Sequence, residues 1–261
     1  MELNVYQIDA FADKPFGGNP ACVIPLEQWL DETLMQQIAF ENNQPETVFF
    51  LKAGNQYQIR WFTPTVEVDI CGHATIASAY VLFNLLGYEG EKIEFFSHRS
   101  GPLSVTRNGE LLTLDFPTDT ITPVALDETL LNCFTELPLE VYRGRNDYMV
   151  VFSDEKTIRE MQPNWQKIEK LHSRGLIVTA RGEQVDFVSR WFGPQSGVNE
   201  DPVTGSAHTT LIPYWRTVLK KDEMNALQVS SRCGKLHCLY QGDRVLISGS
   251  GVHYMTGTIY L

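Results

Sequence analysis

Alternating apolar and polar positions predict a strand-rich first half of the chain. The predicted strands cover residues 5–11, 21–24, 47–52, 56–62, 92–97, 101–107 and 110–116. Gly54-Asn55 separates the third strand from the fourth, and Asn108-Gly109 separates the last two. Asn-Gly and Gly-Asn both favour the tight turn of a hairpin, so each of these neighbouring pairs is expected to be antiparallel.

Two segments of the first half have helical patterns instead. Residues 31–40 place Leu34, Ile38 and Ala39 on one face, and Asp31 is a suitable N-cap. Residues 71–86 are apolar on nearly every side and end before Gly87, which predicts a buried helix.

The second half repeats this order of elements after a weaker stretch at residues 117–138, which is interpreted as a linker. Its predicted strands cover residues 140–142, 148–152, 175–179 and 185–191, and its predicted helices cover 165–171 and about 205–219. Strands at 235–240 and 244–250 are expected to form a hairpin that closes the chain.

Two short motifs recur in the same order in both halves. Arg60-Trp61-Phe62 returns 130 residues later as Arg190-Trp191-Phe192, and Cys71-Gly72-His73-Ala74 has its counterpart in Thr204-Gly205-Ser206-Ala207. A predicted helix follows the second motif in each half. The repeat predicts an internal duplication, with domains at residues 1–118 and 119–261. The last strands are allowed to pack on the first domain.

Composition narrows the partners and the compartment. The net charge of −11 and the lack of a Lys/Arg run argue against binding to nucleic acids or anionic membranes. No apolar run approaches the ~18 residues of a membrane span, and residues 1–10 do not resemble an export signal. A cytoplasmic location is therefore expected. The five cysteines are irregularly spaced, which argues against a disulfide framework.

No metal site is expected. Cys233, His237 and Cys238 lie close together, but a structural zinc site needs four ligands in a recognisable spacing. The sequence also lacks a P-loop, a G-x-G-x-x-G motif, a G-x-S-x-G elbow and an H-E-x-x-H motif, so no nucleotide cofactor is expected.

The repeated small-residue turns are candidate anion sites. Gly72-His73-Ala74 and Gly205-Ser206-Ala207 each open a predicted helix, where the first backbone N–H groups have no partner within the helix. Two well-packed buried helices would explain one such turn equally well. The duplication favours a substrate carboxylate held from both sides of a cleft between the two halves.

Three titratable residues lie near these turns or at a strand start. Glu46 enters an apolar strand, where an acid can lose solvent and act as a general acid or base. Its alternative role is that of a surface residue at a strand end. His73 lies in the first helical turn, and Asp201 precedes the second helix, where capping is its alternative role.

The motifs resemble those of the PhzF family, the phenazine-biosynthesis-like proteins, over nearly the whole chain. The similar segments are VYQIDAFADKPFGGNPACVI, QPETVFF, RWFTPTVEVDICGHATIASAYVL and SRWFGPQSGVNEDPVTGSAHTTLIPYW. The resemblance implies an α+β fold of two pseudo-symmetric domains of the diaminopimelate-epimerase type. Each domain would be a barrel-like sheet around a central helix. Members are often homodimers, so a homodimer is expected.

The resemblance also implies an activity and a set of site residues. The activity is a cofactor-independent isomerisation that moves a proton between carbons of a small carboxylated substrate, with Glu46 as general acid/base. His73 and Asp201 would line the site and assist the transfer or bind substrate amine and hydroxyl groups. The carboxylate would be bound by four residues at the helix starts, namely Gly72, Ala74, Gly205 and Ser206.

Two other functions remain open at this point. Related epimerases use one cysteine at each helix start as opposed acid and base, but here Cys71 has Thr204 as its counterpart. A threonine hydroxyl is a poor base, which counts against an amino-acid epimerase and favours Cys71 as a small packed residue. A non-catalytic carboxylate-binding protein on the same fold is the second alternative.

Overall fold

The computed structural model describes all 261 residues, which divide into two compact units. The first unit combines Met1–Asp115 with Ser248–Leu261, and the second is Phe116–Ile247. The chain passes between the units within β8 and again within β17, so the C-terminal strand completes the first unit. No helix of the chain combines the length and the apolarity that a membrane crossing needs.

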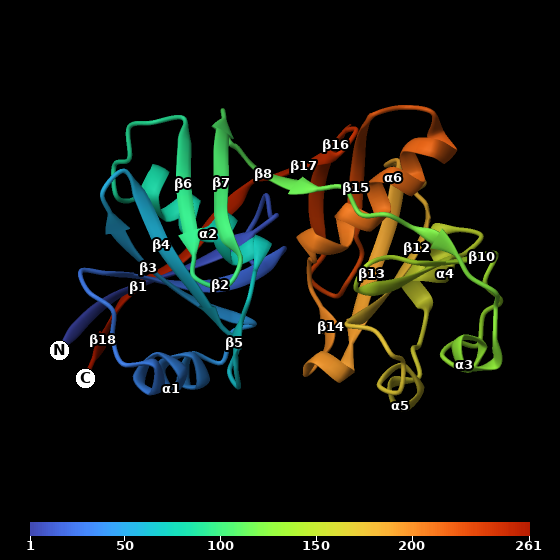
Figure 1. The fold of residues 1–261 in the computed structure, drawn as a ribbon, viewed down its shortest axis with the longest axis horizontal. Helices are drawn as coiled ribbons and strands as arrows, with labels where there is room; N and C mark the ends of the chain where they lie inside the picture. The colour runs from blue at the N-terminus through green and yellow to red at the C-terminus, as the bar shows by residue number, and fades with distance from the viewer. The chain divides into compact units, whose positions relative to one another are not determined.

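The first unit is a mixed sheet with two helices (Figure 1). Its elements are β1 (Glu2–Ala10), β2 (Asn19–Leu26), α1 (Glu32–Asn42), β3 (Glu46–Ala53), β4 (Gln56–Phe62), β5 (Glu67–Val68), α2 (Gly72–Asn84), β6 (Lys92–Ser97), β7 (Gly101–Asn108), β8 (Leu111–Pro117) and β18 (Gly251–Tyr260). The strands pair in the order β18, β1, β2, β3, β4, β6, β7 and β8, with β5 beside the end of β4. The pairs β2–β3 and β4–β6 are parallel, and the others are antiparallel.

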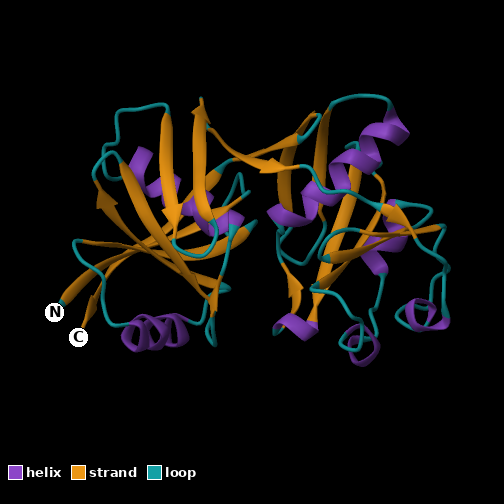
Figure 2. Cartoon of the chain, viewed as in Figure 1, coloured by secondary structure: helices purple, strands orange, loops and turns teal.

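The second unit has a similar set of elements with additional short helices (Figure 2). They are β9 (Thr122–Pro123), α3 (Glu128–Leu131), β10 (Glu140–Arg143), β11 (Asp147–Val151), α4 (Glu155–Glu160), α5 (Trp165–Ile168), β12 (Gly175–Arg181), β13 (Phe187–Gly193), η1 (Pro194–Ser196), β14 (Val198–Asp201), η2 (Gly205–Ala207), α6 (His208–Leu219), β15 (Glu223–Gln228), β16 (Gly234–Gln241) and β17 (Arg244–Gly249). Strand pairing runs from β9 through β10, β11, β12, β13 and β15 to β16, with β14 beside β13.

The pairing pattern shows that the two units share one topology. In each unit a parallel pair (β2–β3 or β11–β12) is followed by two antiparallel pairings on the next strand (β4 or β13). A helix then crosses over to a strand that is again parallel to β4 or β13. Parallel neighbours require such a crossover, and here it is α2 in one unit and α6 in the other.

An arginine on the repeated strand makes the same contacts in both units. Arg60 Nε lies 2.7 Å from Glu67 Oε1, and the guanidinium stands 5.2 Å from the centre of the Phe62 ring. Arg190 Nε lies 2.7 Å from Glu200 Oε1, and its guanidinium stands 4.9 Å from the centre of the Phe192 ring. The recurring Arg-Trp-Phe motif therefore reflects a repeated structural unit.

The central helix α2 is buried because small and apolar residues lie on nearly every face of it. Ten of its residues are buried, and strands of the first unit surround it in Figure 1. Its two buried hydroxyl groups are satisfied by the preceding turn: Thr75 donates to the Cys71 carbonyl and Ser78 donates to the Ala74 carbonyl. On the outside of the sheet, α1 packs Met35, Ile38 and Ala39 against β1 to β4.

Several expected elements have different bounds. Residues 244–250 do not close the chain, because Gly251–Tyr260 adds the long strand β18, which pairs with β1. The linker at 117–138 contains β9 and α3, and the helix expected at 165–171 is the single turn α5. The strands β14 and β15 and the helix α4 were not predicted.

Candidate functional site

In the first unit, the structure brings Glu46 and His73 together. Glu46 is the first residue of β3 and His73 is the second residue of α2, so a strand start and a helix start meet here. Glu46 Oε2 lies 2.9 Å from His73 Nε2, and the two side chains are only 16% and 5% exposed. The carboxylate is therefore largely removed from solvent and held against an imidazole.

The other side of the imidazole is fixed by two further groups. The amide Nδ2 of Asn19, at the start of β2, lies 3.0 Å from His73 Nδ1. Cys71 Sγ lies 3.5 Å from the same ring nitrogen. A doubly protonated imidazole can only donate, so beside protonated His73 the Asn19 amide would turn its oxygen toward the ring and accept a hydrogen bond. Asn19 was missed from the sequence, because only the pairing of β2 with β1 and β3 places it beside the helix start.

The charges of this cluster follow from its burial. Burial alone lowers the pKa of His73, but the interactions with Cys71 and Glu46 and the hydrogen bonds to both outweigh it and raise the pKa well above its usual value. Burial and the charge of Glu46 raise the pKa of the Cys71 thiol to about 11. With this pKa the sulfur is an uncharged thiol at neutral pH, so the charge of Cys71 does not act on His73 there, and the carboxylate of Glu46 is the group that favours a protonated His73.

The same three side chains are the potential metal ligands of this unit. Their donor atoms, from Glu46, Cys71 and His73, all lie within 4.8 Å of one another. A metal ion there would have to displace the bond between Glu46 and His73 and deprotonate a thiol whose pKa is raised. The cysteines and histidine near residue 235, which were considered as a zinc site from the sequence, have other surroundings. His237 pairs with Glu223 at 2.8 Å, and Cys238 is buried.

The small residues of the first helix start have distinct surroundings. Gly72 is the first residue of α2 and is partly exposed, whereas Ala74 is fully buried. The backbone N–H of Ala74 is directed at the sulfur of Cys71. Gly72 is therefore the more accessible of the two for a ligand.

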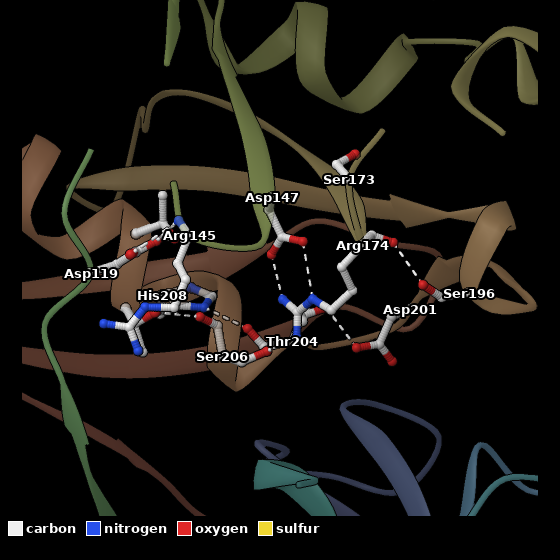
Figure 3. Close-up of polar contacts among 12 residues, drawn as sticks. Asp119, Arg145, Asp147, Ser173, Arg174, Ser196, Asp201, Thr204, Ser206 and His208 are labelled. Atoms are coloured by element: carbon white, nitrogen blue, oxygen red, sulfur yellow. Dashed lines mark hydrogen bonds and ion pairs between the residues drawn. The ribbon is translucent and has the colours of Figure 1, made fainter. Parts of the chain in front are cut away.

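In the second unit, the equivalent helix start has different chemistry. Asp201 ends β14 and accepts a hydrogen bond from the Thr204 hydroxyl at 2.6 Å. Gly205 is buried and Ser206 is partly exposed within η2, the turn that leads into α6. Ser206 occupies the repeat position of His73, and its hydroxyl accepts a hydrogen bond from Arg174 Nη1 at 2.9 Å (Figure 3). Arg174 and its partner Asp147 were not identified from the sequence.

A second histidine, His208, lies at the start of α6 and is uncharged. Its side chain is fully buried, and Nδ1 lies 2.9 Å from the Thr204 carbonyl oxygen (Figure 3). Burial lowers the pKa of His208 to about 4. His208 is thus suited to a structural role, because it can hold the helix start without adding charge.

His208 is expected to make the stability of the protein depend on pH. Its pKa is lower in the folded state than in the unfolded chain, so only the unfolded chain gains a proton as the pH falls below about 6.5. The free energy of unfolding should therefore fall by about 3 kcal/mol more between pH 7 and pH 4 than in the His208→Gln variant. Urea denaturation at both pH values measures this difference. His253→Gln, at an exposed site, should retain the full pH dependence. The prediction would be contradicted if the free energy of unfolding changed equally with pH in the unaltered protein and in His208→Gln.

Comparison with known proteins identifies the family. The model of the phenazine biosynthesis-like proteins (PhzC-PhzF) matches residues 8–257. The chain belongs to this family. An uncharacterized isomerase of Pseudomonas aeruginosa is 50% identical over 261 residues, covering all of both chains. The crystal structure of a PhzF family protein from Enterococcus faecalis shares 44% identity and superposes with a TM-score of 0.97 over all of both chains.

More distant structures extend the fold assignment. A hydroxyproline epimerase from Agrobacterium vitis superposes with a TM-score of 0.61 at 9% identity, covering 99% of this chain and 91% of that one. This likeness confirms the predicted α+β epimerase-type fold of two pseudo-symmetric domains. The relatives named isomerases place this PhzF-family chain among the isomerases.

Proposed function

We propose that this isomerase moves a proton between carbons of a small carboxylated metabolite without a cofactor, and that Glu46 is its general acid/base. The observation that supports the proposal is the buried contact between Glu46 Oε2 and His73 Nε2 at 2.9 Å. A carboxylate beside an imidazolium can take a proton from carbon and return it to another carbon of the same substrate. Glu46 carries the proton between the two transfers, and His73 stabilises its anionic form before the first transfer and after the second.

The remaining site residues are proposed to bind the substrate. Asp201 would accept a hydrogen bond from an amine or hydroxyl group, as it does from Thr204. Ser206 and the backbone N–H groups of Gly72 and Gly205 would bind the carboxylate; Ala74, buried with its N–H on Cys71, would support the turn. The expected homodimer and cytoplasmic location stay predictions.

Proton transfer at carbon can be tested without knowing the natural substrate. The protein is incubated in D₂O with a panel of cyclic and amino carboxylates, and their C–H signals are followed by NMR. Exchange or migration of a double bond supports the proposal and identifies the substrate class. Binding of carboxylates without any exchange across the panel would favour a non-catalytic binding protein.

The alternative function, a thiol-dependent epimerase, can be tested by replacing Cys71. The buried Cys71 thiol has a pKa of about 11, and Thr204 occupies the opposite repeat position, so neither group is a good base at neutral pH. Cys71→Ala is therefore expected to keep the exchange rate within about tenfold of the unaltered protein, whereas loss of a general base costs roughly 10²- to 10⁴-fold. Cys133→Ala, which alters a buried thiol of the second unit, is the matched control. A loss of 10²-fold or more specific to Cys71→Ala would favour the epimerase.

A further inference from the structure

Arg174 is a cation fixed against the second helix start, and no function has yet been given to it. It directly precedes β12, and its backbone is held by two hydrogen bonds: its N–H donates to the Asn146 carbonyl at 2.8 Å, and its carbonyl accepts from the Ser196 hydroxyl at 2.7 Å. Figure 3 shows its guanidinium between Asp147 and the turn that carries Ser206. The orientation of the side chain is therefore set from several elements.

Asp147 holds one edge of the guanidinium. Arg174 Nε donates to Asp147 Oδ1 at 3.0 Å, and Nη2 donates to Oδ2, which is a bidentate contact. The side chain of Asp147 is only 3% exposed, whereas that of Arg174 is 34% exposed. The parallel pairing of Asp147 with Gly175 fixes the carboxylate beside the arginine. The buried partner thus anchors a guanidinium whose other edge remains open to a ligand.

Hydrogen-bond donors remain on the open edge. Arg174 Nη1 donates one hydrogen bond to Ser206 Oγ, and Nε and Nη2 each donate one to Asp147. Two of the five N–H groups of the guanidinium therefore have no acceptor in the protein. Because Ser206 Oγ accepts this bond, its own proton is free to be donated elsewhere. Two guanidinium N–H groups and one hydroxyl group are thus available to a group that only accepts hydrogen bonds.

The surrounding acids keep Arg174 charged and limit where an anion can bind. Burial alone lowers the pKa of Arg174, but its bond to Asp147 and the charges of Asp147, Asp201 and Asp119 raise it. Asp119 already accepts from the Arg145 N–H and the Thr210 hydroxyl, and Asp201 accepts from Thr204. An anion would bind on the Ser206 side of the guanidinium, and a donor group on the same ligand would suit Asp201.

The two copies of the repeat differ at these positions. In the first unit Glu46 pairs with Ala21 at the start of β3, and the matching pair in the second unit is Gly175 with Asp147. Arg174 therefore stands one residue before the counterpart of Glu46, and Ser206 stands at the counterpart of His73. A carboxylate and an imidazole in one unit are replaced by a guanidinium and a hydroxyl group in the other.

We propose that Arg174 and Ser206 together bind the carboxylate of the substrate, with Arg174 as its charged contact. In this proposal the second copy of the repeat supplies the charged contact to the anion, whereas the first copy carries the residues that transfer the proton. This inference rests on the proposed function for the identity of the anion, since the substrate of the isomerisation is a carboxylate.

Carboxylate binding can be measured separately from turnover. Benzoate and cyclohex-1-ene-1-carboxylate are titrated into the full-length protein, with benzamide as the uncharged analogue, and the Arg174 Nε–H signal is followed by NMR. The carboxylates should shift this signal and benzamide should not. Arg174→Gln is expected to weaken carboxylate binding about 10- to 100-fold, as for a lost charge-assisted hydrogen bond. Arg174→Lys keeps the charge and should retain part of the affinity, which covers a failure of the glutamine variant to fold.

Two controls separate this inference from the proposed function. Arg159→Gln removes the same charge from a half-exposed arginine of the same unit, which pairs with Glu155, and should leave binding unchanged. Glu46→Gln should bind carboxylates normally while proton transfer is lost. If the protein transfers protons but its carboxylate affinity does not depend on Arg174, the inference about Arg174 is wrong and the proposed function still holds. Arg174-dependent binding without proton transfer would overturn only the proposed function. The absence of any shift at the solubility limit of both carboxylates would also overturn the inference.

Discussion

Glu46→Gln is expected to lower the rate of proton transfer roughly 10²- to 10⁴-fold, the usual cost of removing a general acid/base. The amide keeps the shape of the side chain and its place beside His73 but cannot take up a proton from carbon. The rate of exchange in D₂O, measured with a carboxylate that the unaltered protein converts, checks the prediction. Glu41→Gln makes the same chemical change at an exposed position of α1 and should retain full activity.

The same variant provides a test that needs no substrate. Glu46 is the anion that stabilises protonated His73, so its replacement should leave burial as the main influence and lower the pKa of His73. An NMR titration of the imidazole Cε1–H signal measures this shift. A folded Glu46→Gln protein with full turnover would show that Glu46 is not the acid/base, and an unchanged titration of His73 would show that the two groups do not interact.

Arg190→Met is expected to lower the free energy of unfolding of the second unit by about 3–5 kcal/mol, as for a buried ion pair that loses one partner. Arg190 is 11% exposed and donates to Glu200 through Nε and Nη2 and to the carbonyls of Ile158 and Met161 through Nη1. Its removal leaves a carboxylate and two carbonyl groups without this donor. Urea denaturation measures the loss, and hydrogen exchange of β12 and β13 amides locates it.

The matched control for this prediction is another arginine of the same unit. Arg159 is 46% exposed, and its i,i+4 partner Glu155 is buried but keeps a hydrogen bond from the Glu183 N–H, so Arg159→Met should cost less than Arg190→Met, about 1 kcal/mol. Equal losses for the two variants would contradict the assignment of Arg190 as the buried clamp. Arg60→Met makes the equivalent change in the first unit, where the hydrogen exchange of β3 and β4 should respond instead.

Local features of the fold were predicted from the sequence because their causes lie within a few residues. The side chain of Asp31 caps α1 by accepting from the Thr33 N–H, and Gly109 takes a positive φ of 61° in the turn between β7 and β8. The buried helix α2 followed from its uniformly apolar sequence. These elements depend on capping, turn geometry and composition, which a short segment carries by itself.

Long-range pairing is where the sequence pattern failed. The segment Gly249-Ser250-Gly251 resembles a turn that ends the last strand, yet β18 begins at Gly251 and pairs with β1 at the opposite end of the chain. The register of this pairing shifts between Gln7 and Ile8, opposite Tyr254 of β18, which has no partner on β1. No local signal in either segment indicates the other, because the strands stabilise each other only once the sheet is formed.

For the candidate site too, some features were predictable from the sequence and others depended on the tertiary structure. The sequence by itself determined the repeat, the helix starts and, through the family resemblance, Glu46, His73, Asp201 and Ser206. Only the tertiary structure decided that Glu46 contacts His73 and that Asn19, Arg174 and Asp147 join the helix starts. Parallel strand pairing places these residues, and its register depends on the whole sheet and not on the residues next to them.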